Sequence, residues 1–418
     1  MPAEPTREHD VLVVGAGVAG LSCALDLAAA GLDVLLVEEG DAVGGRVRTD
    51  RRAGFLLDRG FQVFNTSYPQ VKRRLRLREL RLHPFTPGVL VQTDRGRLRF
   101  TDPTRRPGHA GDLLPGRLGS ARDLAALGLL SARDLLLPPA VLRRGRDTST
   151  RAALASAGVS PALVEEFFRP FLSGVFLEDE LETSARFFHL VWRSMLRGTL
   201  CLPAAGIGAV PAQLAAGLPA GALRLGTPVR ELSEAGAVLA DGRELPARAV
   251  VVATGPGAAG ALLPGLPVPP TRTVSTLYHA APRTPLAEPT LLVDAARRVL
   301  NTVVLSEVAP GYATDGRALV STSVLGAATE GREAEVRSAL AELYGTDTAD
   351  WEPLATYTVR EALPAMPAPW PLTRSTRFGE RRYVCGDHRA TGSLQGAMAS
   401  GTRAAREVLQ DLGAPAGG

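Results

Sequence analysis

Short apolar runs and helical spacing alternate at the start of the chain. The run 9–14 is mostly apolar and is followed directly by Gly15, which is typical of a parallel strand buried on both faces. The stretch 20–30 then places leucine and alanine at helical intervals and stops at Gly31, and 34–37 is a second buried strand. This order predicts a β-α-β unit with a right-handed crossover.

The rest of the chain mixes helical and strand patterns. The leucine-rich stretch 124–137 has the spacing of an amphipathic helix, and 160–197 is also helical in pattern, with several phenylalanines close together. Turn signals such as Asp241-Gly242 separate short apolar runs in the middle of the chain. The further elements that the pattern predicts are strands at 229–231, 238–240, 249–253 and 382–385, several strands within 273–325, and helices at 331–344 and 396–409.

Composition limits the class of protein. A chain of 418 residues exceeds one ordinary core, so two domains are expected. Hydrophobic residues make up 45% and charged residues 22%, as in soluble globular proteins. The net charge is only +4 and no basic run is interleaved with aromatics, which argues against nucleic acid as a partner. The three cysteines lie far apart and in no metal spacing, so neither a disulfide scaffold nor a metal site is expected.

The sequence also bears on location. No charged and then apolar leader precedes the first strand, and no run of about 18 apolar residues occurs. We therefore expect a cytoplasmic protein. The segment 124–137 is either an ordinary core helix, which is favoured, or a helix that touches a membrane surface, so peripheral membrane contact stays open.

The first motif that carries chemistry is Gly15-Ala16-Gly17-Val18-Ala19-Gly20. Glycine is needed first for a tight turn, then so that the backbone approaches a pyrophosphate, and then for close helix–strand packing. The free N–H groups at the start of the helix receive the phosphate charge. Glu38 ends the next strand, where its carboxylate accepts hydrogen bonds from a ribose. The context predicts a dinucleotide site but does not separate NAD from FAD.

A second motif follows directly. The sequence continues with Glu39 and, after a short variable stretch, Gly44-Gly45-Arg46, which allows another close backbone approach and places a guanidinium near phosphate or flavin. With this motif the chain resembles the flavin-containing amine oxidase superfamily, which includes protoporphyrinogen oxidases and phytoene desaturases. The resemblance implies FAD. Gly40 stands where many amine oxidases carry an arginine, so one contact on the adenosine side is not carried over.

Further segments resemble the same superfamily in the expected order. They are 55–64, 201–211, 228–229, 250–255, 383–387 and 392–397, with 169–176 and 359–364 closer to the desaturase and protoporphyrinogen oxidase branch. The resemblance implies that the turn Asp58-Arg59-Gly60 passes beside the isoalloxazine, that the Val229 backbone meets adenine, and that Asp387 holds the ribityl or pyrophosphate region. It also implies that the later helix start faces flavin O2, where its N–H groups stabilise negative charge.

The motifs and the resemblance together give a set of candidate residues. For the cofactor these are Gly15, Gly17, Val18, Ala19, Gly20, Glu38, Glu39, Gly44, Gly45, Arg46, Asp58, Gly60, Phe61, Val229, Gly386, Asp387, Ser393, Leu394 and Gly396. For the substrate they are Arg59, Gln62, His279 and His388, with packing or ion-pair roles as the alternative for each.

Two departures from the amine oxidase pattern narrow the reaction. Many amine oxidases keep an active-site lysine, but the only lysine of this sequence, Lys72, lies in an arginine- and leucine-rich stretch that suits a surface. No cysteine lies where monoamine oxidases attach flavin, so FAD is expected to be non-covalent. No catalytic residue is assigned, because a hydride-abstracting flavoenzyme needs no dedicated base when the substrate loses its proton to water.

The sequence thus predicts an α/β protein in which a discontinuous Rossmann-like FAD-binding domain (8–66, 200–270 and 372–412) is combined with a mixed α+β substrate domain (67–199 and 271–371). The expected reaction is FAD-dependent dehydrogenation of a hydrophobic small molecule at a C–C or C–N bond, by hydride transfer to flavin N5, with dioxygen or a quinone as electron acceptor. The alternatives are an amine oxidase that produces imine or aldehyde and hydrogen peroxide, and a flavoprotein with an isomerase or structural use of FAD.

Overall fold

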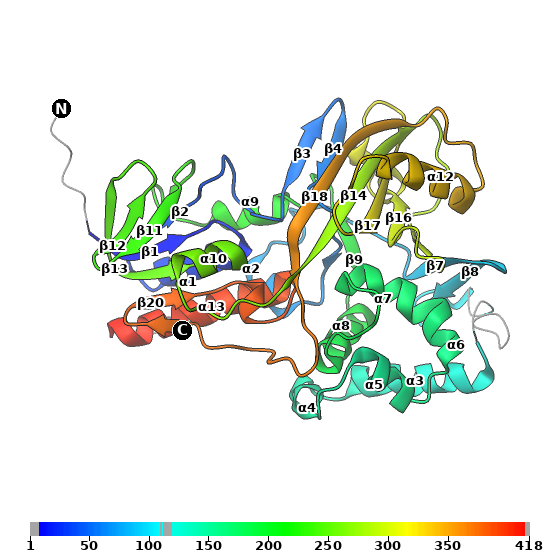
Figure 1. Cartoon of the computed structure of the whole chain (residues 1–418), viewed down its shortest axis with the longest axis horizontal. Helices are drawn as coiled ribbons and strands as arrows, with labels where there is room; N and C mark the ends of the chain where they lie inside the picture. The colour runs from blue at the N-terminus through cyan, green and yellow to red at the C-terminus, as the bar shows by residue number, and fades with distance from the viewer. Residues whose placement is uncertain (1–7, 109–110, 112–118, 414–418) are drawn as a thin grey trace.

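The computed structural model describes residues 8–108, 111 and 119–413. Two large sheets, two small sheets and a group of helices make up this part of the chain (Figure 1). The prediction that no leader precedes the first strand concerns a segment that lies largely outside the described residues. Among the described residues, none of the helices is both long enough and apolar enough to cross a membrane.

The first sheet is built on the predicted β-α-β unit. Strand β1 (His9–Val14) pairs in parallel with β2 (Val34–Val37), and α1 (Val18–Ala29) connects them. On its other side β1 pairs in parallel with β13 (Glu244–Val252), and β13 with β20 (Arg382–Val384). Both β1 and β2 are almost fully buried, as their continuous apolar runs predict. The sheet therefore joins strands from the start, middle and end of the chain.

The second sheet runs in the order β18-β14-β17-β16-β15-β7-β8. Its bounds are β18 (Glu352–Pro364), β14 (Thr271–Ala281), β17 (Ala318–Leu325), β16 (Asn301–Val304), β15 (Leu291–Asp294), β7 (Gly88–Thr93) and β8 (Gly96–Thr101). Helix α12 (Arg332–Tyr344) covers one face through buried side chains such as Leu340. The sequence pattern does not predict the long strand β18, because only two of its thirteen residues are buried and it contains no continuous apolar run.

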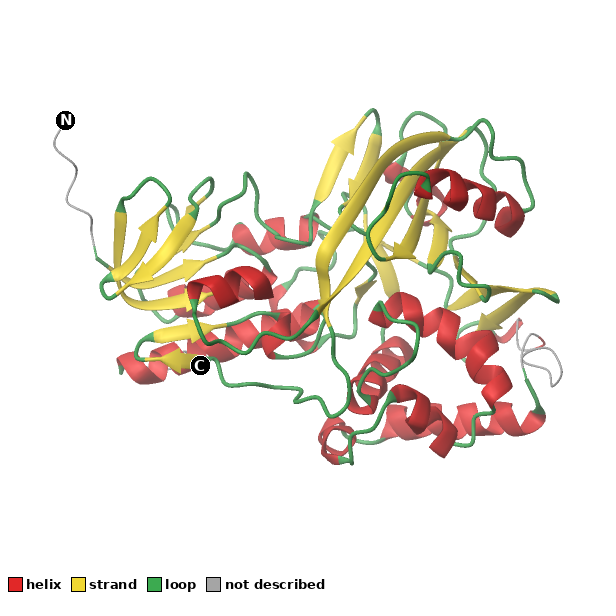
Figure 2. Ribbon diagram, viewed as in Figure 1, coloured by secondary structure: helices red, strands yellow, loops and turns green. Residues whose placement is uncertain are grey.

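The third part of the fold is helical. It consists of α3 (Ala121–Leu136), α4 (Pro139–Arg144), α5 (Thr150–Ser156), α6 (Pro161–Leu163), η2 (Val164–Phe168), α7 (Arg169–Phe176) and α8 (Ala185–Arg197) (Figure 2). The helical pattern of 160–197 is interrupted after α7, where Leu177 takes a left-handed conformation with φ 53°. Helix α8 then restarts at Ser184, whose hydroxyl accepts from the Phe187 N–H. The phenylalanines of this stretch form the core of the helical part.

The remaining elements include strands β10, β11, β12 and β19 of the first sheet, two small sheets and further helices. They are β3 (Thr49–Arg52), β4 (Phe55–Asp58), β5 (Phe64–Asn65), α2 (Pro69–Arg74), β6 (Leu82–Pro84), β9 (Leu200–Pro203), α9 (Ala209–Ala215), β10 (Leu223–Arg224), β11 (Val229–Ser233), β12 (Gly236–Leu239), α10 (Pro256–Leu262), α11 (Leu305–Val308), η3 (Pro310–Tyr312), β19 (Arg377–Gly379), η4 (Asp387–Arg389) and α13 (Leu394–Leu412).

Helix α13, from the end of the chain, lies directly against α1 (Figure 1). A Cβ atom at Gly401 of α13 would lie 2.2 Å from the Ala19 carbonyl oxygen of α1, so the two backbones are in contact there. This close packing brings the N-terminal ends of two helices, distant in sequence, to the same side of the first sheet.

Candidate functional site

The three glycines of the first motif differ in what surrounds them. Gly15 has φ +103°, and a Cβ atom at Gly20 would lie 2.0 Å from the Gly15 carbonyl oxygen. Both glycines are thus required by the chain's own packing. Gly17, the N-cap of α1, has nothing within 4 Å of a Cβ position, and no side chain caps the helix. The open side of Gly17 and the uncapped N–H groups leave room for an anion.

The carboxylate of Glu38 faces this turn. Its Oε2 accepts from the Ala16 N–H at 2.7 Å and its Oε1 from the Gly40 N–H at 3.0 Å. The Thr227 N–H donates to the Glu38 carbonyl at 2.8 Å, just before β11 starts at Val229. The predicted ribose and adenine contacts, Glu38 and Val229, therefore lie on neighbouring segments. Glu39, in contrast, is exposed at the surface.

The second glycine motif lies beside the first. The Gly44 N–H donates to the Ala16 carbonyl at 2.8 Å, and Gly44 pairs with Gly17 in an isolated bridge. Gly44 has φ +114°, and a Cβ atom there would lie 2.3 Å from the Val47 carbonyl oxygen. A Cβ atom at Gly45 would lie 3.7 Å from the Gly17 Cα atom. Two turns without side chains thus face one another, as a bound dinucleotide requires.

Arg46 connects this site to the end of the chain. Its Nη2 donates to Asp387 Oδ1 at 2.7 Å, across 341 positions of sequence, and Asp387 is buried. Its Nη1 donates to the carbonyl oxygens of Glu361 and Ala362 in β18, at 3.1 and 2.8 Å. Gln62 donates from Nε2 to the Arg46 carbonyl at 2.8 Å. Two predicted cofactor residues, Arg46 and Asp387, are therefore brought together, and Gln62 supports their loop.

The C-terminal segment is shaped by close backbone contacts. The Gly386 N–H donates to Ser400 Oγ at 3.1 Å, and a Cβ atom at Gly386 would lie 2.5 Å from the ring of His388. His388 is fully buried, and burial lowers its pKa to about 4. Ser393 caps α13 by accepting from the Gly396 N–H at 3.0 Å. We call the three segments 15–20, 44–46 and 386–396 the glycine region.

The side chain of Asp58 is enclosed by the chain itself. It is 2% exposed, and its carboxylate accepts from Thr49 Oγ1 at 2.5 Å, from the Ile207 N–H at 3.0 Å and from the Tyr312 hydroxyl at 2.9 Å. Burial raises its pKa to about 6. Its carbonyl also accepts from the Tyr278 hydroxyl at 2.7 Å. The contacts of Asp58 are with the chain itself, and they hold the turn that follows at Gly60.

That turn leads onto a row of polar side chains on the second sheet. The N–H of Phe61 donates to Thr276 Oγ1 at 3.2 Å. Directly opposite residues of a sheet share a face, and the register places four polar residues side by side across four strands. We call this set the polar row: Tyr357 of β18, Thr276 of β14, Ser323 of β17 and Asn301 of β16. No motif in the sequence identifies it.

The polar row is largely buried and uncharged. Thr276, Ser323 and Asn301 are 0%, 4% and 5% exposed, and the hydroxyl oxygens of Thr276 and Ser323 are 3.4 Å apart. Within the described part of the chain, Asn301 Oδ1 has no hydrogen-bond partner. A buried amide oxygen without a partner is costly, so a ligand that donates a hydrogen bond to it would stabilise this face.

Two of the substrate candidates lie apart from the polar row's buried part. Arg59 donates hydrogen bonds to both carboxylate oxygens of Asp50, as the ion-pair alternative predicts, and its side chain is half-exposed. The Tyr357 hydroxyl donates to the same carboxylate at 2.8 Å, and burial together with Asp50 raises the tyrosine pKa to about 12. His279 lies on the opposite face of β14, where its Nε2 is 3.2 Å from Glu333 Oε1 of α12.

The comparisons with known proteins agree with this geometry. The family model for flavin containing amine oxidoreductases matches residues 18–409. This chain belongs to the flavin-containing amine oxidoreductase family. As a member of it, the chain is an FAD-dependent oxidoreductase, and its FAD is bound non-covalently.

Individual relatives of this family member match over shorter stretches. Hydroxyneurosporene desaturase of Rubrivivax gelatinosus is 53% identical over 62 residues, which are 15% of this chain and 12% of the desaturase. Coproporphyrinogen III oxidase of Propionibacterium freudenreichii is 29% identical over 181 residues, 41% of this chain and 33% of the oxidase. The structure of cyclohexylamine oxidase from Brevibacterium oxydans covers 97% of this chain and is itself covered completely, with a TM-score of 0.70 at 19% identity. That likeness is one of fold.

The residues of the glycine region fit the cofactor of the family. Gly17 leaves the space that a side chain would fill, the start of α1 is uncapped, and Glu38 faces the same turn. The first turn of α13 likewise carries no acidic side chain that would oppose an anion. These features give the pyrophosphate a helix start, the ribose a carboxylate, and the flavin a second helix start.

Proposed function

We propose that this protein dehydrogenates a hydrophobic small molecule at a C–C or C–N bond. The hydrogen bond from Phe61 to Thr276 carries the proposal, because it joins the segment expected beside the flavin to the polar row. Bound FAD supplies the hydride acceptor, N5. The substrate would therefore lie against Phe61 and the polar row.

The side chains around this place suit an apolar molecule with one hydrogen-bonding group. Phe61, Val63 and Leu200 are only partly buried and adjoin the apolar cluster that includes Phe85. The rings of Phe61 and Phe85 meet edge to face at 6.3 Å. Apolar walls with a few fixed polar groups are typical of small-molecule sites. We propose that Asn301 accepts a hydrogen bond from the substrate and that Thr276 holds Phe61 in position.

In this proposal the chain's residues bind and orient rather than exchange protons. Arg46 keeps the 44–46 turn against Asp387 and β18, and Glu38 and Val229 hold the adenosine end. The ranges 8–66, 200–270 and 372–412 then act as the FAD-binding unit, and 67–199 with 271–371 as the substrate unit. Arg59, through Asp50 and Tyr357, borders the entrance to the row.

Lys72 favours dehydrogenation of this kind over the lysine-dependent type of amine oxidase. It is exposed on α2, and it is the only lysine of the sequence. Dioxygen or a quinone is proposed as the electron acceptor. Because a hydrophobic substrate partitions into bilayers, we also propose that the protein contacts a membrane surface peripherally.

Anaerobic titration of the FAD-bound protein tests the proposal. We expect the flavin absorbance to bleach with apolar cyclic or polyene substrates and to return when dioxygen or a quinone is admitted. Bleaching by primary amines alone, with hydrogen peroxide released in air, would identify an amine oxidase instead. Turnover of an isomerisable substrate without any bleaching would identify a non-redox use of FAD.

A further inference from the structure

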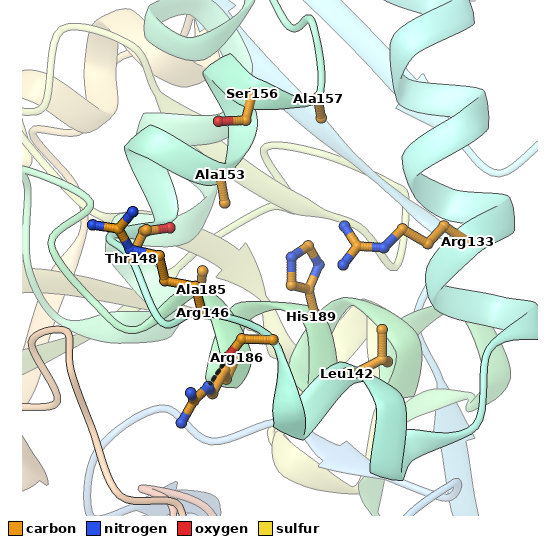
Figure 3. Close-up of a pocket in the computed structure, with 11 residues that line it drawn as sticks. Arg133, Leu142, Arg146, Thr148, Ala153, Ser156, Ala157, Ala185, Arg186 and His189 are labelled. Carbon is orange, nitrogen blue, oxygen red and sulfur yellow. Dashed lines mark hydrogen bonds between the residues drawn. The ribbon is translucent and has the colours of Figure 1, made fainter.

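A cavity of about 220 Å³ lies in the helical part of the fold, between α3, α4, α5 and α8 (Figure 3). Arg133 of α3 and His189 of α8 line it together with Arg146, Thr148 and Ser156. Figure 3 shows the guanidinium of Arg133 and the ring of His189 turned toward one another. The cavity exceeds by several times the roughly 30 Å³ that a water occupies in the liquid, so a phosphate group fits in it.

Among the described residues, the arginines that line this cavity have no carboxylate partner. Residues 129–146 contain four arginines and one acidic residue, Asp134. Asp134 is buried and is 2.7 Å from His189 Nδ1, which leaves Nε2 of that ring for another partner. Arg133 and Arg146 are exposed and have no ion-pair partner among the described residues. Figure 3 thus shows two groups facing each other across the cavity: Arg133, which donates to anions, and His189, which does so from Nε2 when both ring nitrogens carry a proton.

Exposed apolar side chains surround the same place. Leu129, Leu136 and Val141 are 73%, 77% and 51% exposed. With Leu135, they are four of the seven large hydrophobic side chains exposed on the described surface, so the apolar exposure is concentrated on α3 and α4. Leu129, Arg133 and Leu136 are spaced i, i+4 and i+7 and share one side of α3. Exposed leucines beside unpaired arginines are the pattern of a helix that lies in a membrane interface.

We propose that this surface docks on an anionic phospholipid bilayer, with a lipid phosphate between Arg133 and His189 and the leucines in the interfacial layer. The inference rests on the peripheral membrane contact of the proposed function and assigns the residues and the lipid chemistry to it. The arginines supply the attraction to phosphate, and Leu129, Leu136 and Val141 supply the burial of apolar area.

Co-sedimentation of the FAD-bound protein with vesicles tests this assignment. The vesicles are equimolar phosphatidylcholine and phosphatidylglycerol, with phosphatidylcholine alone for comparison. We expect binding to the anionic vesicles, weakened by salt. Arg133→Glu should lower the partition coefficient about tenfold, and Leu136→Ser about fivefold. Arg406→Glu on α13 and Val268→Ser, both exposed and outside the helical part, are the matched controls and should bind like the wild type.

Each other outcome overturns the assignment. Equal binding by all five proteins, or no binding by the wild type, removes the proposed surface. If inorganic phosphate raises the melting temperature of the wild type but not of Arg133→Glu while no vesicle binds, the cavity belongs to a soluble phosphate compound instead. Flavin absorbance is recorded on every sample, so loss of FAD, which would count against the proposed function, is distinguished from loss of lipid binding.

Discussion

The glycine region and the polar row, the two sides of the proposed site, are built by opposite means. In the glycine region glycines leave backbone N–H groups and helix starts open to a cofactor. The ion pair between half-buried Arg46 and buried Asp387 joins distant segments there. In the polar row the backbone is already paired in the sheet, and only side chains point outward. The first arrangement suits a cofactor common to a family, and the second allows the substrate to differ between members.

The largest effect is expected where the glycine region depends on one ion pair. Arg46→Ala leaves the Asp387 carboxylate buried without a partner, since Asp387 is 4% exposed. Loss of one partner of a fully buried pair costs about 3–5 kcal/mol, and because the Arg46 side chain is itself 33% exposed we expect a cost of about 3 kcal/mol. We expect the urea midpoint of unfolding to fall accordingly, and the purified variant to lose its flavin. A yellow variant with unchanged stability would show that the pair does not hold these segments together.

The pH dependence of the free energy of unfolding reports on Asp58, the buried residue before the turn that leads to the polar row. The pKa of Asp58 rises from its ordinary 3.8 to about 6 through burial. Between pH 3.8 and about pH 6 the unfolded chain releases the Asp58 proton, whereas the folded chain keeps it. The contribution of Asp58 to the free energy of unfolding is therefore complete below pH 3.8 and is lost as the pH rises to about 6. The loss is at most about 3 kcal/mol.

Asp58→Asn isolates this contribution. The amide oxygen can keep the bonds from Thr49 and Ile207, and the amide N–H₂ can donate to the Tyr312 oxygen. Urea unfolding of both proteins between pH 4 and pH 7 should show the wild type losing stability relative to the variant as pH rises. A constant difference across this range would mean that Asp58 ionises in the folded protein as it does in water.

Much of the glycine region follows from local sequence, and the polar row does not. Gly15, Gly20 and Gly44 are conspicuous because their own turns exclude a side chain, and the β-α-β pattern places them correctly. Thr276 and Asn301 lie in one row, with Ser323 between them, only because of the register of three antiparallel strands. A shift of one residue in that register would turn a side chain to the other face of the sheet. Patterns within one short segment of sequence cannot predict that register, because it joins strands that are far apart along the chain.

Contacts between distant segments, which the sequence pattern does not contain, also decide where individual candidate residues lie. The resemblance implies that Asp58 and Gly60 form a turn beside the flavin. This turn leads to Phe61, whose N–H reaches Thr276, and the Asp58 carboxylate is enclosed by the chain. His279 has Tyr278 as its neighbour, so the two rings necessarily point to opposite faces. Which face meets the substrate segment depends on α12, whose position the sequence pattern alone does not give.

Two alanine substitutions compare Gly17, which we expect FAD binding to require, with Gly20, which the packing of the chain itself requires. Gly17→Ala meets no atom within 4 Å, whereas Gly20→Ala would place Cβ 2.0 Å from the Gly15 oxygen. We expect Gly17→Ala to keep the stability of the FAD-free protein and to weaken FAD binding about thirtyfold, or about 2 kcal/mol. Gly20→Ala should instead destabilise the FAD-free protein by about 1–3 kcal/mol. If both variants lose stability equally, the open side of Gly17 is not reserved for a cofactor.

The smallest effect is expected from the second arginine–aspartate pair. Arg59 is 39% and Asp50 31% exposed in their side chains, so water screens both charges and can replace either partner. Arg59→Gln should change the free energy of unfolding by less than about 1 kcal/mol. Because Asp50 keeps the hydrogen bond from Tyr357 at the edge of the polar row, any effect on turnover should appear in KM with kcat unchanged. A fall in kcat at constant KM would instead place Arg59 in contact with the reacting part of the substrate.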